Sequence, residues 1–332
     1  YGFPEDRNEQ GLPLRKGKVN YNFVVVDTIS QYLSNERQLV RFYEASKVIR
    51  STKISTALTP RWSLPHDFSR ISNFRDLGGY QTRYTNRRVK SGVLYRCANP
   101  CDATPEALDF MTNELHINKV FDLRGPQEAI ENGIIARIQV ENLAFNKSKN
   151  LSPDKIAKHY QGLLISSYKF PQAYMIVTKN SIPQIRTFFE YVLDGHCDDH
   201  HAVVFHCTAG KDRTGILGML ILGILGVDED TIAREYELTT IGLLTEAKLI
   251  KKLSERGSLY YDMLGEGAEN LAKDYKLTPE VMCQNLLSST YEAMRLFIDD
   301  FNQEFGSVES FFLDVLEFIP EDIQKIRAVL LE

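Results

Sequence analysis

Ten consecutive residues, 206–215, carry the side chains best suited to chemistry in this sequence: His-Cys-Thr-Ala-Gly-Lys-Asp-Arg-Thr-Gly. The apolar run 202–205 before them predicts a buried strand. The apolar segment 213–225 after them predicts a helix that ends at Gly226. The N–H groups of a tight loop and of the helix N-terminus that follows it bind anions. The segment therefore predicts a cradle for a tetrahedral oxyanion such as phosphate.

Cys207 and Arg213 are the predicted reactive residues of this cradle. The donors that bind an oxyanion also stabilise a thiolate, which is the nucleophilic form of cysteine. The planar guanidinium of Arg213 can hold two phosphate oxygens and stabilise the charge that they gain during transfer. We expect Cys207 to attack phosphorus, to form a phosphocysteine intermediate and to release phosphate by hydrolysis, without a metal or another cofactor.

The remaining loop residues are expected to support these two. Thr214 can donate a hydrogen bond to the sulfur, and Gly210 lets the chain turn without a Cβ clash. His206 is expected to organise the loop rather than to act as a base. The expected substrate-binding residues are Thr208, Ala209, Gly210 and Lys211, together with His206 as the organiser of the loop. The alternative is a buried structural cysteine that lies beside a glycine and an arginine by chance.

A proton donor for the leaving oxygen has two candidates, Asp212 inside the loop and Asp122 at the carboxyl end of another predicted strand. Ligands of parallel α/β sheets bind at the carboxyl ends of the strands, which is why Asp122 qualifies. The aspartates that directly precede the 202–205 strand are expected at its far end. Asp212 is the first choice. The alternative for Asp122 is a structural carboxylate that pairs with Arg124 or Arg213.

Lys211 bears on the substrate class because it adds a second cation beside Arg213. A second cation suits substrates with more than one phosphate, such as phosphoinositides or inositol polyphosphates. The alternative is a solvated lysine without such a preference. A further basic run, 83–90, is more typical of the exposed turn of a hairpin than of a substrate clamp.

From residue 71 onward, predicted strands alternate with predicted helices, which favours an α/β fold with a mostly parallel central sheet flanked by helices. Helices are expected to begin at Thr104, and at Ser181, where Gln184 would complete a capping box. We expect three regions: an N-terminal tail and extension at 1–70, a main domain at 71–332, and a helical C-terminal part of it from about 240. Strands are expected at 93–95, 119–123, 138–143 and 202–205.

Composition narrows the possible partners and location. The net charge of −5 gives no global attraction to nucleic acid. No apolar run reaches the roughly 18 residues of a membrane span. The five cysteines are odd in number and widely spaced, which is typical of a reducing compartment. Since the sequence also starts without the pattern of a secretory signal, we expect a cytoplasmic protein that binds no nucleic acid and spans no membrane.

The 206–215 loop resembles the phosphate-binding loop of the protein tyrosine phosphatase superfamily. Its Lys211-Asp212 pair is similar to the atypical branch of bacterial tyrosine and lipid phosphatases and their fungal relatives. Cys97 departs from this branch, in which a serine is common at that position. Further blocks that resemble the branch follow in the family order: NFRDLGGY at 73–80, KSGVLYR at 90–96, FDLR at 121–124 with Glu128, and FGSVE at 305–309.

The resemblance implies a cysteine-phosphatase fold over roughly 71–332, and a helical lid over the site within 245–285. It also points to the same two acid candidates. The implied activity is that of a tyrosine or dual-specificity phosphatase, with a phosphorylated protein as partner. Phosphoinositides and inositol polyphosphates or pyrophosphates stay open as alternative substrates.

Two interpretations belong to other classes of protein. An inactive phosphate-binding scaffold usually lacks the nucleophile or the arginine, and this sequence has Cys207 and Arg213. A sulfur transferase can also carry its cysteine on a loop after a strand, but the arginine and Lys211 favour phosphate over sulfane chemistry.

Overall fold

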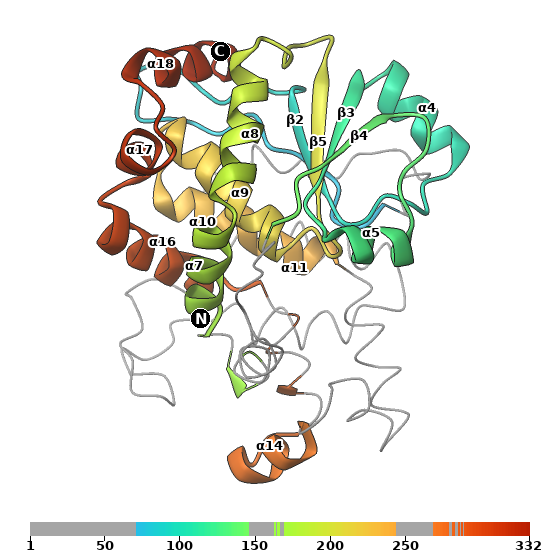
Figure 1. Cartoon of the computed structure of the whole chain (residues 1–332), viewed down its shortest axis with the longest axis vertical. Coiled ribbons are helices and arrows are strands. Elements are labelled where there is room, and N and C mark those ends of the chain that lie inside the picture. Colours follow the sequence, from blue (N-terminus) through green and yellow to red (C-terminus); the bar gives the residue numbers. More distant parts are fainter. Residues whose placement is uncertain are drawn as a thin grey trace, which may run out of the picture.

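The computed structural model of the protein describes residues 71–145, 169–243, 268–278 and 289–332, with residues 163, 165–166, 281–282, 285 and 287 between them. Together they form an α/β fold with helices on both faces of one sheet (Figure 1). The predicted tail and extension at 1–70 lie outside the described residues, as does most of the lid predicted within 245–285.

The central sheet has five strands in the order β1-β2-β5-β3-β4. β1 pairs antiparallel with β2, and the other three pairings are parallel, so the prediction of a mostly parallel sheet is confirmed. Cys97 at the end of β2 and Asp122 at the end of β3 both lie opposite His206 at the end of β5. Three strand ends therefore meet at one edge, directly before Cys207. The strands are β1 (Arg75–Asp76), β2 (Leu94–Cys97), β3 (Ile117–Asp122), β4 (Gln139–Asn142) and β5 (Ala202–His206).

The side chains of β5 alternate between two hydrophobic cores. Ala202 and Val204 join the core under α4 (Pro105–Asn113), whereas Val203 and Phe205 join the larger core on the other face. A strand buried on both faces needs the uninterrupted apolar run that predicted it. The helices that contribute to the larger core are α7 (Phe170–Asn180), α8 (Ile182–Leu193), α9 (Asp212–Ile224), α10 (Glu229–Glu237), α16 (Tyr291–Phe305) and α18 (Pro320–Leu330).

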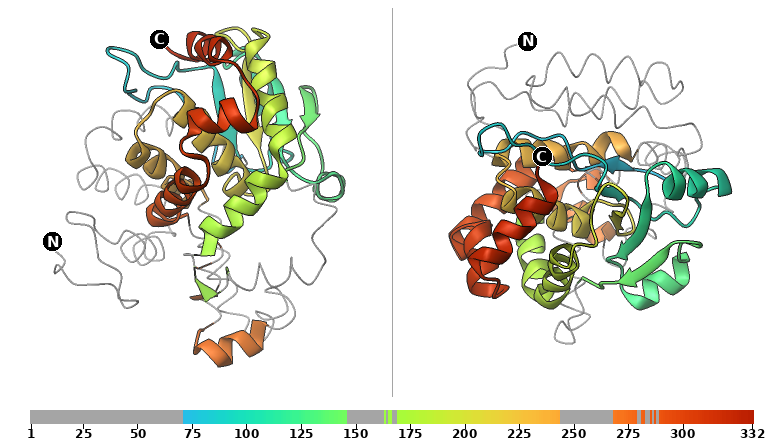
Figure 2. Two further views of the ribbon diagram at one scale, coloured as in Figure 1. Left: turned by 60° about the vertical axis from the view of Figure 1, so that its left-hand side comes forward. Right: turned by 90° about the horizontal axis from the view of Figure 1, so that it is seen from above.

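The described C-terminal part is helical, as predicted. In both views of Figure 2 its red helices lie beside the yellow-green segment of α7 and α8, where α16 contacts α7 and α18 contacts α8. Shorter elements complete the described chain: α5 (Pro126–Asn132), α11 (Thr239–Gly242), α14 (Ala268–Tyr275), α17 (Val308–Ser310) and the π-helical turn η4 (Phe311–Val315).

One of the two predicted helix caps is confirmed and the other is partly wrong. Thr104 caps α4 by accepting a hydrogen bond from the N–H of Ala107. Ser181 does occupy the N-cap of α8, but the capping box with Gln184 does not form. The Ser181 hydroxyl instead donates to the carbonyl of Val177 at 2.7 Å. Because α7 ends directly before Ser181, the carbonyl of Val177 receives no backbone hydrogen bond from the next helical turn. It therefore accepts the hydrogen bond of the Ser181 hydroxyl.

The basic run 83–90 lies on a hairpin, as predicted. Gln81 and Arg88 form an antiparallel bridge across its turn. Three of its four cations lie in ion pairs with carboxylates of distant segments: Arg83 with Glu309 at 3.1 Å, Arg88 with Glu332 at 2.8 Å, and Lys90 with Asp199 at 3.0 Å.

Phe188 of α8 packs the helical layer against the sheet. The centre of its ring lies 5.1 Å from that of Phe121 on β3 and 5.9 Å from that of Phe205 on β5. Phe188 is fully buried. We expect Phe188→Ala to lower the free energy of unfolding by about 3–5 kcal/mol, because it leaves a cavity in this core. Urea unfolding measures the loss. Ile130→Ala, at a side chain that is 71% exposed, should change it by less than about 0.5 kcal/mol. Equal losses in the two variants would contradict this account of the core.

Candidate active site

Cys207 lies where β5 leaves the sheet, and it is only 2% exposed. Residues 207–211 connect β5 to α9, which begins at Asp212. The order predicted from the sequence, strand then tight loop then helix, is thus present. The loop lies at the carboxyl edge of the sheet and at the N-terminus of α9, and both places favour bound anions.

Gly210 is the position where the loop passes closest to the sheet. Its φ is +63°, and a Cβ there would lie 2.2 Å from the carbonyl oxygen of Cys97. No side chain fits at such a distance, so only glycine allows the loop to close over the end of β2. The N–H of Asn99 donates to the carbonyl of Thr208 at 2.9 Å and holds the loop on its other side.

A buried polar network holds the loop from below. Asn73 donates to the carbonyl of Gly210 at 2.9 Å through Nδ2, and Arg96 donates to the same carbonyl at 2.9 Å through Nη2. Glu235 of α10 accepts from Arg75 at 2.6 Å on one oxygen and from Arg96 at 2.6 Å on the other. The sequence blocks at 73–80 and 90–96 contain three of these residues. Glu235 belongs to none of the blocks, and its role is visible only in the structure.

This network places an excess of positive charge under the loop. Burial and then the charge of Arg96 lower the pKa of Arg75 to about 10, while Glu235 opposes the shift. Arg75 therefore keeps its charge at neutral pH, and the two guanidinium groups share a single carboxylate, that of Glu235. Since the interior screens charge poorly, this excess favours an anion in the loop above it.

Arg213 is held in place by Glu128 of α5. Two hydrogen bonds join them, from Nη1 at 2.6 Å and from Nη2 at 2.9 Å. The hydroxyl of Thr208 also donates to Glu128. Burial alone would raise the pKa of Glu128, but the bonds and charge of Arg213, with the Thr208 and Gly125 donors, lower it to about 2. Sequence reasoning named Glu128 only as part of a family block and did not assign it this role.

Asp122 and His206 lie together at the strand ends directly before Cys207. Both oxygens of Asp122 accept hydrogen bonds from Arg124, at 2.7–3.1 Å, and its side chain is only 2% exposed. His206 binds the carbonyl of Cys207 through Nδ1 at 3.0 Å, so Nδ1 carries the proton. Burial lowers the pKa of His206 to about 4, and the imidazole is neutral at pH 7. These contacts match the two structural interpretations made from the sequence, a loop-organising histidine and an Asp122–Arg124 pair.

Asp212 faces a different environment. Its Oδ1 accepts a hydrogen bond of 2.6 Å from the Tyr174 hydroxyl, which is in turn 2.6 Å from the Tyr236 hydroxyl. The side chain of Asp212 is 41% exposed. Neither tyrosine belongs to a motif, and no sequence signal singled them out.

Lys211 turns inward rather than towards solvent. Its Nζ lies 4.2 Å from the centre of the Phe170 ring and 3.5 Å from Asp212 Oδ1, and its side chain is 4% exposed. The interpretation of Lys211 as a solvated lysine is therefore wrong. An aromatic ring and a carboxylate compensate the cost of burying the ammonium group.

Thr214 differs from its prediction in one respect. Its hydroxyl oxygen is buried and has no hydrogen-bond partner among the described residues, so the predicted bond to the Cys207 sulfur is not formed there. Thr214 lies in the first turn of α9, fully buried. Thr214 therefore lies next to the loop, as predicted, but its hydroxyl does not form the predicted hydrogen bond with the sulfur of Cys207.

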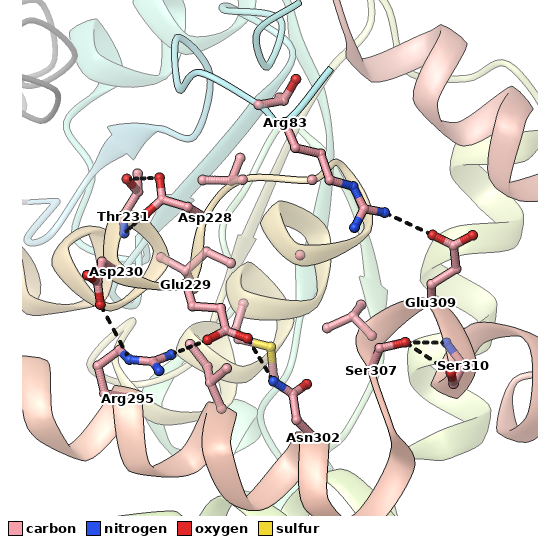
Figure 3. Close-up of a pocket in the computed structure, with 18 of the residues that line it drawn as sticks. Arg83, Asp228, Glu229, Asp230, Thr231, Arg295, Asn302, Ser307, Glu309 and Ser310 are labelled. Carbon is pink, nitrogen blue, oxygen red and sulfur yellow. Dashed lines mark hydrogen bonds and ion pairs between the residues drawn. The ribbon is translucent and has the colours of Figure 1, made fainter. Parts of the chain in front are cut away.

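A cavity of about 1160 Å³ lies apart from this loop, around the N-terminus of α10 (Figure 3). Most of its charged residues are paired with one another, as in the contacts of Arg295 with Glu229 at 2.7 Å and of Arg83 with Glu309 at 3.1 Å. None of the described residues that line it belongs to the 206–215 segment. The cavity is thus separate from the candidate active site.

Within the described ranges, no cluster of three or more histidine, cysteine, aspartate or glutamate side chains is arranged to hold a metal ion. Among the helices that the structure describes, none has the length and apolar character needed to cross a membrane.

Comparisons with known proteins agree on one family. The model described as "Tyrosine phosphatase family" matches residues 66–332. A Cupriavidus necator protein, provisionally named a tyrosine-protein phosphatase, is 31% identical over 184 residues, which cover 52% of this chain and 62% of that protein. The tyrosine-protein phosphatase of Nostoc commune is 33% identical over 87 residues, 26% of this chain and 29% of that protein. The match spans less than two thirds of the length of either relative.

The Glu128–Arg213 pair predicts an acid-dependent part of the stability. The pKa of Glu128 is lowered from 4.5 to about 2, so the stabilisation is complete above pH 4.5 and is lost as the pH falls towards 2. We expect Glu128→Gln to reduce the free energy of unfolding at pH 7 by about 1–2 kcal/mol, after allowance for its partial exposure. Urea unfolding between pH 7 and pH 3 should show this gap narrowing below pH 4.5. Glu131→Gln, on the exposed side of the same helix, is the control and should show no such gap. A gap for Glu128→Gln that is independent of pH would contradict the ion pair.

Proposed function

The chain belongs to the tyrosine phosphatase family, and from this premise we propose that it hydrolyses phosphate monoesters of tyrosine in proteins through a phosphocysteine intermediate. The observation that carries the proposal is the position of Cys207 and Arg213 at the two ends of one loop, above two buried guanidinium groups. Such a loop offers a nucleophile, a fork of donors and a positive field to the same phosphate group.

In the first step, the Cys207 thiolate attacks phosphorus, and the bond between phosphorus and the tyrosine oxygen breaks as the sulfur–phosphorus bond forms. Glu128 occupies the Nη1–Nη2 edge of Arg213 and so leaves its Nε edge for two phosphate oxygens. Asp212 gives a proton to the leaving oxygen, which departs as the neutral phenol. In the second step, water attacks phosphorus, Asp212 takes up a proton from that water, and inorganic phosphate and the thiolate are released.

Asp212 is preferred over Asp122 as the proton donor because of its accessibility. Both oxygens of Asp122 are bound by Arg124 and its side chain is almost fully buried, so neither oxygen is available to a leaving group. Among the residues that the structure describes, only Oδ1 of Asp212 has partners, and its side chain is 41% exposed. We assign Asp122 to positioning: it pairs with Arg124 and lies 3.8 Å from His206 Nε2.

The environment of Lys211 supports a substrate with one phosphate. A second phosphate would need a cation that reaches out of the loop, whereas the ammonium group of Lys211 lies over Phe170 and beside Asp212. The basic run 83–90 lies on the hairpin and pairs with carboxylates of its own surroundings. Phosphotyrosine is therefore the proposed substrate class, ahead of phosphoinositides and inositol polyphosphates.

Cys207→Ser tests the mechanism. We expect it to lower kcat/KM by about 10⁴-fold or more, because the hydroxyl replaces the thiolate nucleophile. The assay compares p-nitrophenyl phosphate, a phosphotyrosine peptide, a phosphoinositide panel and an inositol pyrophosphate, each with a chelator present. Cys197→Ser, a buried cysteine outside the loop, is the matched control and should keep its activity. A chelator-sensitive activity, or one that survives Cys207→Ser, would exclude this mechanism. Bound vanadate without turnover would favour the scaffold interpretation.

Asp212→Asn and Asp122→Asn separate the two acid candidates. For phenyl phosphate, whose leaving group needs a proton, we expect Asp212→Asn to lower kcat/KM by about 10²-fold or more. For 2,4-dinitrophenyl phosphate, whose leaving group does not, the loss should be much smaller. Asp122→Asn should reduce both rates to a similar extent, because it disturbs the position of Arg124. The reverse pattern would assign the proton to Asp122.

A further inference from the structure

Two tyrosine hydroxyls form a chain that ends on Asp212. Tyr174 of α7 donates to Asp212 Oδ1 at 2.6 Å, and the hydroxyl of Tyr236 of α10 lies 2.6 Å from that of Tyr174. Both tyrosines are 1% exposed. Buried hydroxyls are usually satisfied by the nearest backbone carbonyl, but this pair is directed at a carboxylate of the loop. The direction of the two hydroxyls therefore indicates that they act on Asp212.

The direction of the two hydrogen bonds follows from the single proton that each tyrosine hydroxyl carries. A tyrosine hydroxyl has one proton, and that of Tyr174 lies on Asp212. Tyr236 must then donate its own proton to the Tyr174 oxygen. Burial first, and then the Asp212 carboxylate, hold the pKa of Tyr174 well above its ordinary value of 10, so it stays a donor at neutral pH. Donors arranged in series polarise one another and strengthen the last bond.

Packing leaves the Tyr174 ring little freedom to move. The Phe297 ring of α16 lies 5.4 Å away at 86°, and the Phe170 ring lies 5.5 Å away. The Tyr236 ring lies against Gly215 of α9, where an added Cβ would come within 2.9 Å of it. Three helices and the start of α9 thus fix both hydroxyls relative to the catalytic loop.

The contacts that the described residues make with Asp212 fall on one of its two oxygens. The Tyr174 hydroxyl and the Lys211 ammonium group, at 2.6 Å and 3.5 Å, both lie against Oδ1. A carboxyl group whose Oδ1 is bound to donors carries its own proton on Oδ2. The half-exposed position of the side chain lets Oδ2 face a ligand in the loop.

We propose that Tyr174, held by Tyr236, is the positioning residue that orients Asp212, so that Oδ1 is fixed and Oδ2 carries the proton given to the leaving oxygen. This rests on the function proposed above, with Asp212 as the acid. Tyr174 itself touches neither the substrate nor the reacting atoms. A tyrosine pair that served packing alone would affect the stability of the fold and the binding of phosphate, but not the dependence of the rate on the leaving group.

Tyr174→Phe tests the proposal, because it removes the donor and keeps the ring. For phenyl phosphate we expect kcat/KM to fall about tenfold, since a misaligned acid loses part of its contribution. For 2,4-dinitrophenyl phosphate it should change by less than about twofold. The inhibition constant of inorganic phosphate should stay as in the wild type. Tyr236→Phe should give a smaller loss with the same dependence on the leaving group, and it provides a second variant should Tyr174→Phe not fold.

Tyr291→Phe is the matched control. It also removes a hydrogen bond between a buried tyrosine and an aspartate, here Asp230, but away from the loop. It should leave both substrates unaffected. In an Asp212→Asn background, Tyr174→Phe should cause no further loss, because the acid on which it acts is absent.

Equal losses on the two substrates, or a loss that persists in the Asp212→Asn background, would overturn the positioning role. These outcomes are distinct from a failure of the proposed function. If Asp212→Asn itself showed no dependence on the leaving group, or if Cys207→Ser stayed active, the proposed function would fail first. If both behaved as expected and only Tyr174→Phe did not, the positioning role alone would fail.

Discussion

The loop at 207–211 depends on one buried interaction, the contact of Glu235 with Arg75 and Arg96. Each oxygen of this carboxylate accepts a 2.6 Å hydrogen bond from a different guanidinium. Without it, two buried cations would face each other uncompensated beneath the loop, which is among the costliest arrangements in a protein interior. With it, Arg96 is directed at the carbonyl of Gly210, and the loop is held open for an anion.

Helix α10 links this interaction to the proposed acid. Glu235 points to the strands under the loop, and the adjacent Tyr236 points to Tyr174 and Gly215. Neighbouring residues of a helix project about 100° apart, so one helix can serve two sides of the loop. The floor of the cradle and the orientation of Asp212 therefore depend on the placement of the same turn. A shift of α10 would disturb the proposed phosphate binding and the proposed proton transfer together, which makes its packing against α9 and α16 important for the proposed function.

The sequence predicted the parts of the site that are contiguous. The run 206–215 predicted the order of strand, loop and helix, and the blocks around Asn73 and Arg96 pointed to residues that hold the loop. It did not predict the partners that come from distant helices. Glu235, Tyr174 and Tyr236 lie in amphipathic helices, where a polar side chain on the buried face looks like any other polar residue until tertiary packing is known. The burial of Lys211 was not predictable for the same reason, since the ring that covers it lies on α7.

The two aspartates that the sequence offered as acid candidates, with Asp212 as the first choice, differ sharply in the structure, and the difference comes from their neighbours. Asp122 follows a strand and has Arg124 two residues later, so a local turn binds both of its oxygens and buries them. Asp212 begins a helix, and its partner is a hydroxyl from α7 that engages only one oxygen. A guanidinium fork takes both oxygens of a carboxylate, whereas a hydroxyl takes one. The second oxygen of Asp212 is therefore left for the leaving group, and the geometry of hydrogen-bond donors divides the two carboxylates into a positioning group and a proposed acid.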